Sequence, residues 1–192
     1  DIASAEACLE KELMVSPDSA QAAVNLGWIL EEQNRAPEAL MQYRKALYYN
    51  PNHPDLRWNH GLTCLMLGDY TRGWRDYEFR WKARNKQKPT YKKPEWKGDA
   101  LDGRSLLLYT EQGFGDTIMF LRFAQQMGQA NNRIYLQCQP QLRRLFGAQP
   151  ELEYVVANGK KPPSYDLQAP LMSLPHLLKL SRENDFHSQA YL

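Results

Sequence analysis

A short apolar run, a glycine-rich turn and a second apolar pattern mark the stretch from residue 105 to residue 127. Residues 106–108 are consecutive leucines, which is typical of a parallel strand covered on both faces. Gly113 and Gly115 lack a Cβ, so they allow a sharp turn and a close approach to whatever lies above the strand end. A helix is expected to begin near Asp116. The stretch therefore predicts the first β-α unit of an α/β domain.

Three further strands are predicted downstream, at Arg133–Cys138, Tyr154–Ala157 and Tyr165–Ala169. Short helices are expected at Gln141–Phe146 and at Ser173–Leu180, where the serine precedes apolar positions as an N-cap would. Strands that alternate with short helices indicate a parallel sheet. Residues 104–192 are therefore expected to form a Rossmann-like α/β domain.

The first half of the chain repeats its pattern every 34 residues. This offset aligns Pro17 with Pro51, Asn25 with Asn59, Gly27 with Gly61, Leu40 with Trp74, and Tyr43 with Tyr77. Small residues at fixed places let two helices approach closely, and the large residues fill the space between them. We predict helical pairs at about 20–53 and 54–87, and a partial repeat at 1–17 that corresponds to a second helix.

A 34-residue period of this kind resembles the tetratricopeptide repeat. The match is closest in the frame that begins at Ala20, where Leu26, Gly27, Ala39, Tyr43, Ala46 and Pro51 occupy the family's positions. Stable arrays need about three or more repeats, so we expect further repeats before Asp1. Residues 1–85 would then be tetratricopeptide repeats, whose stacked hairpins form a concave surface for a protein or peptide partner.

Asn25 and Asn59 are candidate peptide-binding residues, because both occupy the sixth position of a repeat. A side-chain amide can donate to and accept from a peptide backbone. The pair resembles the asparagine ladder of the repeats in O-linked N-acetylglucosamine transferases. The alternative is that both are ordinary solvated asparagines.

The net charge of +2 hides a basic segment, because residues 72–97 hold ten Lys or Arg and only three Asp or Glu. Trp81, Tyr91 and Trp96 are interleaved with these cations, a composition that nucleic-acid sites also show. Prolines at 89 and 94 prevent a continuous helix. We favour a linker at 86–103 whose aromatic rings pack against both neighbours while the charges stay in water. Nucleic acid is the less favoured partner, and a phosphate-bearing ligand stays open.

Cysteine and histidine spacing suggests no metal site. The chain has three cysteines without a C-x-x-C pair and four histidines without metal-ligand spacing. No apolar run is long enough to span a bilayer, and no signal-peptide pattern opens the sequence. We expect a reducing, cytoplasmic location. Since the sequence starts at Asp1 and stops at Leu192 without a terminating feature, we also expect a piece of a longer protein.

The loop after the first strand is the candidate chemical site, because ligands of open α/β sheets bind beyond the carboxyl ends of the strands. Its candidate residues are Glu111, Gln112, Gly113, Gly115 and Asp116. A dinucleotide fingerprint would require a third glycine at the position of Ile118. The Asp116 carboxylate either caps the helix or acts on a ligand, and the two roles are compatible.

A wider set of residues resembles the glycosyltransferase-like domain that follows tetratricopeptide repeats in many bacterial proteins. It comprises Trp96-Lys-Gly98, Leu101-Asp-Gly103, Glu111-Gln-Gly-Phe-Gly-Asp116, Phe120-Leu-Arg122, Leu171-Met-Ser-Leu-Pro175 and, in the last repeat helix, Gly73-Trp-Arg-Asp-Tyr-Glu78. That domain is similar to the heptosyltransferase group of two-domain (GT-B) transferases, so residues 104–192 would be the N-terminal half of a GT-B fold.

The resemblance implies that Asp116 is the base for an acceptor hydroxyl, with Glu111, Gln112, Gly113 and Gly115 lining the substrate. It also implies that a second α/β domain, not found in this sequence, holds most of a nucleotide-sugar donor. We therefore expect no cofactor in this chain, a glycan or protein acceptor, and no complete enzyme in this stretch alone. The alternative is a non-catalytic assembly scaffold in which the repeats bind partners.

Overall fold

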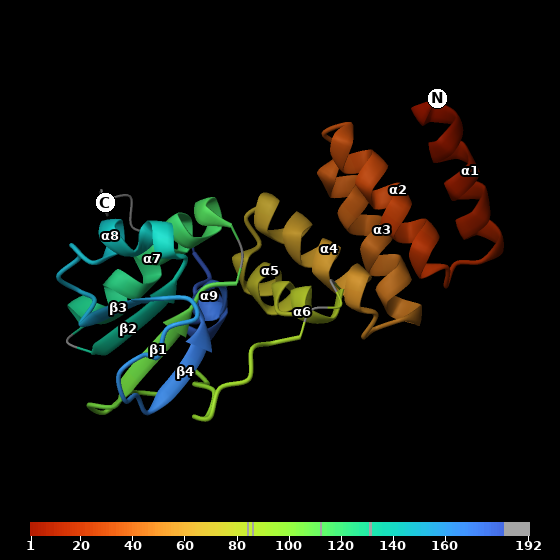
Figure 1. Ribbon diagram of the computed structural model, residues 1–192. Helices are drawn as coiled ribbons and strands as arrows, with labels where there is room; N and C mark the ends of the chain where they lie inside the picture. The colour runs from red at the N-terminus through yellow and green to blue at the C-terminus, as the bar shows by residue number, and fades with distance from the viewer. Residues whose placement is uncertain (84, 86, 112, 131, 183–192) are drawn as a thin grey trace. The chain divides into compact units, whose positions relative to one another are not determined.

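The computed structural model describes residues 1–83, 85, 87–111, 113–130 and 132–182 (Figure 1). Two compact units account for Asp1–Lys88 and Pro89–Lys179. The first is helical and the second is an α/β unit with a parallel sheet. The predicted α + α/β fold class is therefore confirmed.

The helical unit consists of consecutive helices joined by short turns. They are α1 (Ile2–Val15), α2 (Ala20–Glu32), α3 (Ala36–Tyr49), α4 (Pro54–Met66), α5 (Tyr70–Tyr77) and α6 (Arg80–Ala83). Helix α2 pairs with α3 and α4 pairs with α5, while α1 packs against α2 (Figure 1). The helices thus form hairpins, and α2 and α4 begin at the positions that the 34-residue spacing predicted.

Close helix contacts explain why small residues recur in this unit. Gly27 of α2 lies against the ring of Tyr43 on α3, and a Cβ built on this glycine would overlap that ring. Gly61 of α4 has the equivalent place, where a Cβ would lie 2.8 Å from the backbone nitrogen of Tyr77 on α5. Tyr43 is fully buried in the core together with Ala39 and other apolar residues. The repeated glycine therefore sets the distance between the paired helices.

We expect Gly27→Ala to lower the free energy of unfolding by about 1–3 kcal/mol, since the buried ring of Tyr43 must move to admit a methyl group. Urea denaturation followed by circular dichroism measures this loss. Gly115→Ala is the matched control: it is also a helical glycine, but a Cβ there meets nothing within 4 Å. The control should be neutral or slightly stabilising, because alanine is the better helix former. Equal effects at both glycines would contradict the packing argument.

The α/β unit is built on a four-stranded parallel sheet with the order β3-β2-β1-β4 (Figure 1). Its elements are β1 (Ser105–Tyr109), α7 (Phe114–Gln129), β2 (Arg133–Cys138), η1 (Pro140–Leu142), α8 (Arg143–Phe146), β3 (Tyr154–Ala157), β4 (Leu167–Pro170), η2 (Leu171–Ser173) and α9 (Leu174–Leu177). Every residue of β1 is buried, as its run of leucines predicted. The strand order reverses between β1 and β4, which makes their carboxyl ends the switch point of the sheet.

The end of the unit differs from the sequence prediction in two places. The fourth strand starts at Leu167, because the carboxylate of Asp166 accepts hydrogen bonds from the backbone N–H and the hydroxyl of Ser105, both 2.8 Å away. The predicted helix at Ser173–Leu180 is a 3₁₀ turn followed by the short helix α9. Ser173 precedes α9 but makes no side-chain capping bond, and Lys179 has a positive φ of 56°. That backbone conformation ends helical structure.

Part of the basic stretch belongs to the sheet. Trp96 donates its backbone N–H to the carbonyl of Gln168 in β4 (2.8 Å), and Gln168 donates to the carbonyl of Pro94 (3.1 Å). The Trp96 ring is buried, and its indole N–H donates to the carbonyl of Asp99 (2.7 Å). The ring of Tyr91 packs on Tyr109 with 4.7 Å between centroids. The segment from Pro94 to Trp96 therefore extends the sheet at β4 in addition to connecting the two halves of the chain.

Candidate functional site

Asp116 lies in the first turn of α7, directly beyond the carboxyl end of β1. Gly113 is the N-cap of this helix, and Asp116 is its third residue. The capping interpretation of Asp116 is therefore wrong, since the chain enters the helix three residues earlier. Its carboxylate is half-buried and forms no hydrogen bond or ion pair with the residues that the structure describes. A carboxylate at this end of a helix interacts favourably with the helix dipole and remains available to a ligand.

Gly113 precedes α7 and Gly115 lies in its first turn, and the sharp turn expected of them does not depend on glycine. Gly113 has a φ of −63°, which any residue can adopt, so the turn itself does not require glycine. Both Gly113 and Gly115 are exposed, and a Cβ at either would meet nothing within 4 Å. The open space above the turn would let a ligand come close to the backbone. The packing of the chain itself does not require glycine at either position.

Thr117 and Gln139 hold the start of α7 against the end of β2. The hydroxyl of Thr117 donates to the carbonyl of Gly113 (3.0 Å), and the Nε2 of Gln139 donates to the same hydroxyl (3.0 Å). Thr117 is almost fully buried. This pair fixes the helix turn that carries Asp116. No local sequence pattern indicates this contact, because the partners lie 22 residues apart.

The remaining candidates in this loop are less well defined. Glu111 is half-buried between β1 and α7, whereas Gln112 lies outside the described residues. Besides the Thr117–Gln139 pair, a second hydrogen bond that the sequence did not predict involves the basic stretch. The hydroxyl of Tyr91 donates to the Oε1 of Gln137 in β2 (2.9 Å). Burial raises the pKa of Tyr91 to about 12, so its hydroxyl stays protonated at neutral pH. It acts as a hydrogen-bond donor at the carboxyl ends of the central strands.

Asn25 and Asn59 lie on α2 and α4, which are adjacent helices of the helical unit. The exposed Asn25 accepts a hydrogen bond at Oδ1 from Gln21 (2.9 Å), and the half-buried Asn59 donates from Nδ2 to the carbonyl of Asp55 (2.9 Å). Within the described parts of the chain, no partner is seen for the Nδ2 of Asn25 or the Oδ1 of Asn59. In each side-chain amide, one polar atom therefore bonds within its own helix, and the other polar atom remains available to a ligand.

Helices α2 and α4 are also joined by a polar contact. The hydroxyl of Thr63 on α4 donates to the carboxylate of Glu31 on α2. Burial raises the pKa of Glu31, although this hydrogen bond opposes the rise. The contact fixes the two asparagine-bearing helices side by side, which is the arrangement a ladder of amides requires.

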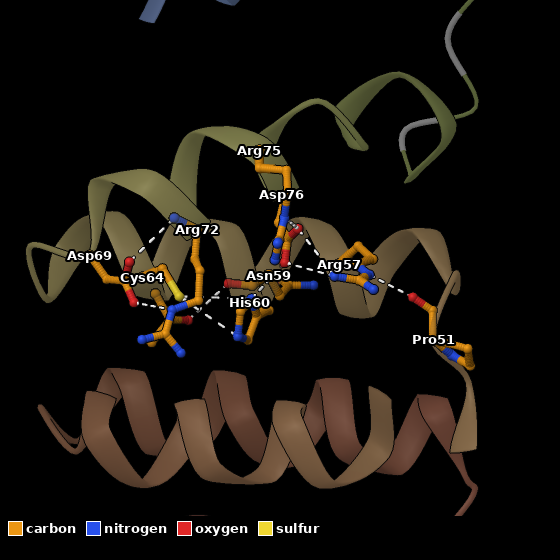
Figure 2. A network of polar contacts seen from close by, with 10 residues as sticks. Pro51, Arg57, Asn59, His60, Cys64, Asp69, Arg72, Arg75 and Asp76 are labelled. Atoms are coloured by element: carbon orange, nitrogen blue, oxygen red, sulfur yellow. Dashed lines mark hydrogen bonds and ion pairs between the residues drawn. The ribbon is translucent and has the colours of Figure 1, made fainter. Parts of the chain in front are cut away.

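A network of polar residues is buried between α4 and α5, and Figure 2 shows it at close range. Asp76 of α5 is completely inaccessible. Its carboxylate accepts from the Nδ1 of His60 (2.8 Å), the Nη1 of Arg57 (3.2 Å) and the Nε of Arg75 (2.9 Å). The spacing of the histidines in the sequence suggested no metal site and did not indicate this contact. Asp76 lies 16 residues from His60 and 19 residues from Arg57, so no local pattern points to the network.

Cys64 touches this network, and the presence of Cys, His and Asp together invites comparison with nucleophilic catalysis. The thiol lies 3.8 Å from Nδ1 and 3.7 Å from Nε2 of His60, so it packs against the ring and is not aligned with one nitrogen. Burial raises the pKa of Cys64 to about 11. A buried protonated thiol is a poor nucleophile. The network is therefore structural, and it locks α4 onto α5.

The described ranges contain no group of three His, Cys, Asp or Glu residues that could hold a metal ion. None of their helices is long and apolar enough to cross a membrane.

No family model matches the chain. Among curated proteins it is 28% identical over 126 residues to Protein FlbA of Caulobacter vibrioides, covering 62% of this chain and 21% of that protein. It is 36% identical over 63 residues to the peroxisomal targeting signal receptor of Candida albicans, covering 33% of this chain and 11% of the receptor. The aligned stretches thus span about a fifth or less of the length of these relatives.

Among solved structures, a mutant O-GlcNAc transferase of Thermobaculum terrenum superposes with a TM-score of 0.40 at 13% identity, covering 81% of this chain and 38% of that one. This score is too low to support an argument about fold or function. The fold described above rests on the helices and the sheet register of this chain.

Proposed function

We propose that this chain is part of a glycosyltransferase-like protein in which the helical unit binds a protein or peptide and the α/β unit supplies the acceptor side of a sugar-transfer site. The observation that carries the proposal is the position of Asp116. This carboxylate, which has no hydrogen-bond or ion-pair partner among the described residues, stands at the switch point of a parallel sheet, beside an open turn, and ligands of such sheets bind there.

The proposed chemistry is removal of a proton from an acceptor hydroxyl by Asp116 as the sugar carbon is attacked. An ionised carboxylate within hydrogen-bond reach of the hydroxyl can act as this base. Glu111, Gln112, Gly113 and Gly115 would line the acceptor. A nucleotide-sugar donor would be held mainly by a second α/β domain, so the stretch described here would be inactive on its own.

The test is to offer a panel of nucleotide sugars to the protein purified from its own source and to detect transfer or donor hydrolysis by mass spectrometry. Turnover with one donor class supports the proposal and names that donor. Neither transfer nor hydrolysis with any donor, in a protein that still binds peptides, would refute it.

A second candidate function is a non-catalytic assembly scaffold, in which the helical hairpins provide all of the activity. The similarity to a protein named as a receptor for a targeting signal favours this reading, because such a receptor recognises a segment of another protein. In both proposals the partner binds the surface of α2 and α4 through Asn25 and Asn59.

The double substitution Asn25→Ala with Asn59→Ala is expected to weaken peptide binding about thirtyfold, since it removes two hydrogen bonds that each contribute about 1 kcal/mol. The probe is the tightest binder selected from a degenerate library of fluorescein-labelled decapeptides, and affinity is read by fluorescence anisotropy. Asn52→Ala with Gln87→Ala is the control, because both residues are exposed amides outside α2 and α4. Unchanged affinity in the first pair would exclude the amide ladder.

A further inference from the structure

A groove of about 540 Å³ lies along the outer side of the sheet in the α/β unit, between α8 and β3. Among the residues that the structure describes, β3 is the last strand on this side, because the sheet order is β3-β2-β1-β4 (Figure 1). The groove is lined by Arg143, Arg144, Leu152, Glu153, Tyr154 and Val155. It is far along the sheet from the turn that carries Asp116, since β2 separates β3 from β1.

Strand β3 presents backbone hydrogen-bonding groups along its outer edge, and its residue Val155 also lines the groove. Asn158 donates its N–H to the carbonyl of Cys138 in β2 (2.7 Å). Because backbone groups alternate in direction along a strand, Val156 and Tyr154 also face β2, and Val155 and Ala157 face away from it. The Ala157 carbonyl accepts from the N–H of Lys160 (3.0 Å). The N–H and C=O of Val155 and the N–H of Ala157 thus point to the open edge.

The side chains of the groove make it cationic. Arg143 and Arg144 are both exposed on α8, and in the described part of the chain neither guanidinium forms an ion pair or a hydrogen bond. The one carboxylate among the lining residues, Glu153, is paired with Arg133 at 3.1 Å. The side chain of Tyr154 adds an exposed apolar surface, with 47% of its area accessible. Within the described ranges, two guanidinium groups without an ion-pair partner therefore stand beside a strand edge that no other strand covers.

We propose that this groove binds an extended, acidic peptide segment of a partner protein, which pairs with β3 as an additional strand. Main-chain hydrogen bonds to Val155 and Ala157 hold the segment, and its carboxylates pair with Arg143 and Arg144. Strand addition at an exposed edge supplies affinity through the backbone and selectivity through side chains. The guanidinium groups select carboxylates, which they bind in a bidentate manner. The inference is independent of sugar transfer and of the partner bound by α2 and α4.

The first test measures charge selectivity on the whole chain. A fluorescein-labelled octapeptide of alternating glutamate and valine should bind, while the same peptide with lysine in place of glutamate should not. Arg143→Glu combined with Arg144→Glu should weaken binding about tenfold or more, because like charges then face each other. Lys160→Glu with Lys161→Glu is the control, since it makes the same change in net charge at two exposed lysines of this unit. An equal loss in both double variants would overturn the proposal.

The second test examines the strand edge. Hydrogen-exchange mass spectrometry should show slower exchange at residues 155–157 when the glutamate peptide is present. Val155→Pro should abolish binding, because it removes an N–H that points away from β2 and leaves the sheet's own hydrogen bonds in place. Val155→Ala keeps this N–H and should still bind.

Other occupants of the groove would give different results. Peptide binding without protection of these amides would overturn strand addition. Displacement of the peptide by inorganic phosphate at low concentration would assign the groove to phosphate ligands. Protection that grows with protein concentration in the absence of peptide would assign it to a second copy of the chain. Each of these outcomes contradicts the proposal.

Discussion

Asp116→Asn in the full-length protein is expected to lower the turnover number for sugar transfer by about 10²–10⁴-fold, the usual contribution of a general base. The amide cannot accept the proton of the acceptor hydroxyl, while it keeps nearly the same shape. The fold should tolerate the change, because the Asp116 side chain is neither the N-cap nor a partner in any hydrogen bond among the described residues. The cost to stability should be only the lost interaction with the helix dipole, about 0.3–1 kcal/mol.

The kinetic measurement needs both the turnover number and KM for the best donor and acceptor, together with a melting curve of each variant. Loss of turnover with little change in KM fits a base that acts in the transition state. Asp99→Asn serves as the matched control, because Asp99 is exposed in the same unit and lies outside the strand-end turn. Retention of turnover within about twofold in Asp116→Asn would remove the assigned role, and the scaffold hypothesis would then take precedence.

Asp76→Ala is expected to destabilise the helical unit by about 3–5 kcal/mol, the usual cost of removing one partner from a buried ion pair. Asp76 is fully buried, so its loss leaves His60 and the guanidinium group of Arg57 without their carboxylate (Figure 2). A substantial part of this cost comes from the uncompensated polar groups and not from the lost bonds themselves. Urea denaturation of the variant and the parent gives the difference directly.

Asp69→Ala provides the comparison for this network. Asp69 is the N-cap of α5 and accepts from the backbone N–H of Arg72 (3.2 Å), but its contacts are exposed. Its removal should cost only about 1 kcal/mol, as for other N-caps. Equal losses of stability in the two variants would show that the burial of Asp76 does not increase the cost of removing its carboxylate.

The carboxylate of Asp76 also makes the stability of the helical unit depend on pH. Burial would raise the pKa of Asp76, but hydrogen bonds from His60 and Arg75 and the charge of Arg57 outweigh burial and lower the pKa to about 2. A carboxyl group with a depressed pKa stabilises the fold fully above its ordinary value of 3.8, and this contribution disappears as the pH falls through about 2. The stability gap between the parent and Asp76→Ala should therefore be constant above pH 4 and shrink below it. A gap that stayed constant down to pH 2 would contradict the assignment.

The sequence determined the elements whose signals are local. The strands Arg133–Cys138 and Tyr154–Ala157 have the predicted bounds, because apolar and β-branched runs bounded by turn residues are a property of the segment itself. The 34-residue spacing located α2 and α4, since Gly27 and Gly61 must recur wherever two helices come close. The parallel sheet followed from the alternation of strands and helices.

Local pattern failed where a tertiary contact decided the outcome. Asp116 matched an N-cap by composition, but the N-cap is Gly113, three residues earlier, and Thr117 bonds back to Gly113 and to Gln139, which follows β2. The basic stretch was predicted as a linker with packed aromatic rings; the rings of Trp96 and Tyr91 do pack in the α/β unit, but the backbone pairing of Trp96 with Gln168 in β4 was not predicted. In both cases the partner lies more than 20 residues away, beyond the reach of a periodicity argument.

By itself, then, the sequence determined the two kinds of architecture, most of the strands, and the residues that deserve testing in the turn and on α2 and α4. Only the tertiary structure decided the strand order, the burial of Asp76 among His60, Arg57 and Arg75, and the exposed edge of β3 beside Arg143 and Arg144. The physical reason is that apolar periodicity is a property of a single segment and can be recognised from its sequence alone. The value of a polar or charged side chain, in contrast, depends on which distant group the fold brings within hydrogen-bond reach and on whether water is excluded there.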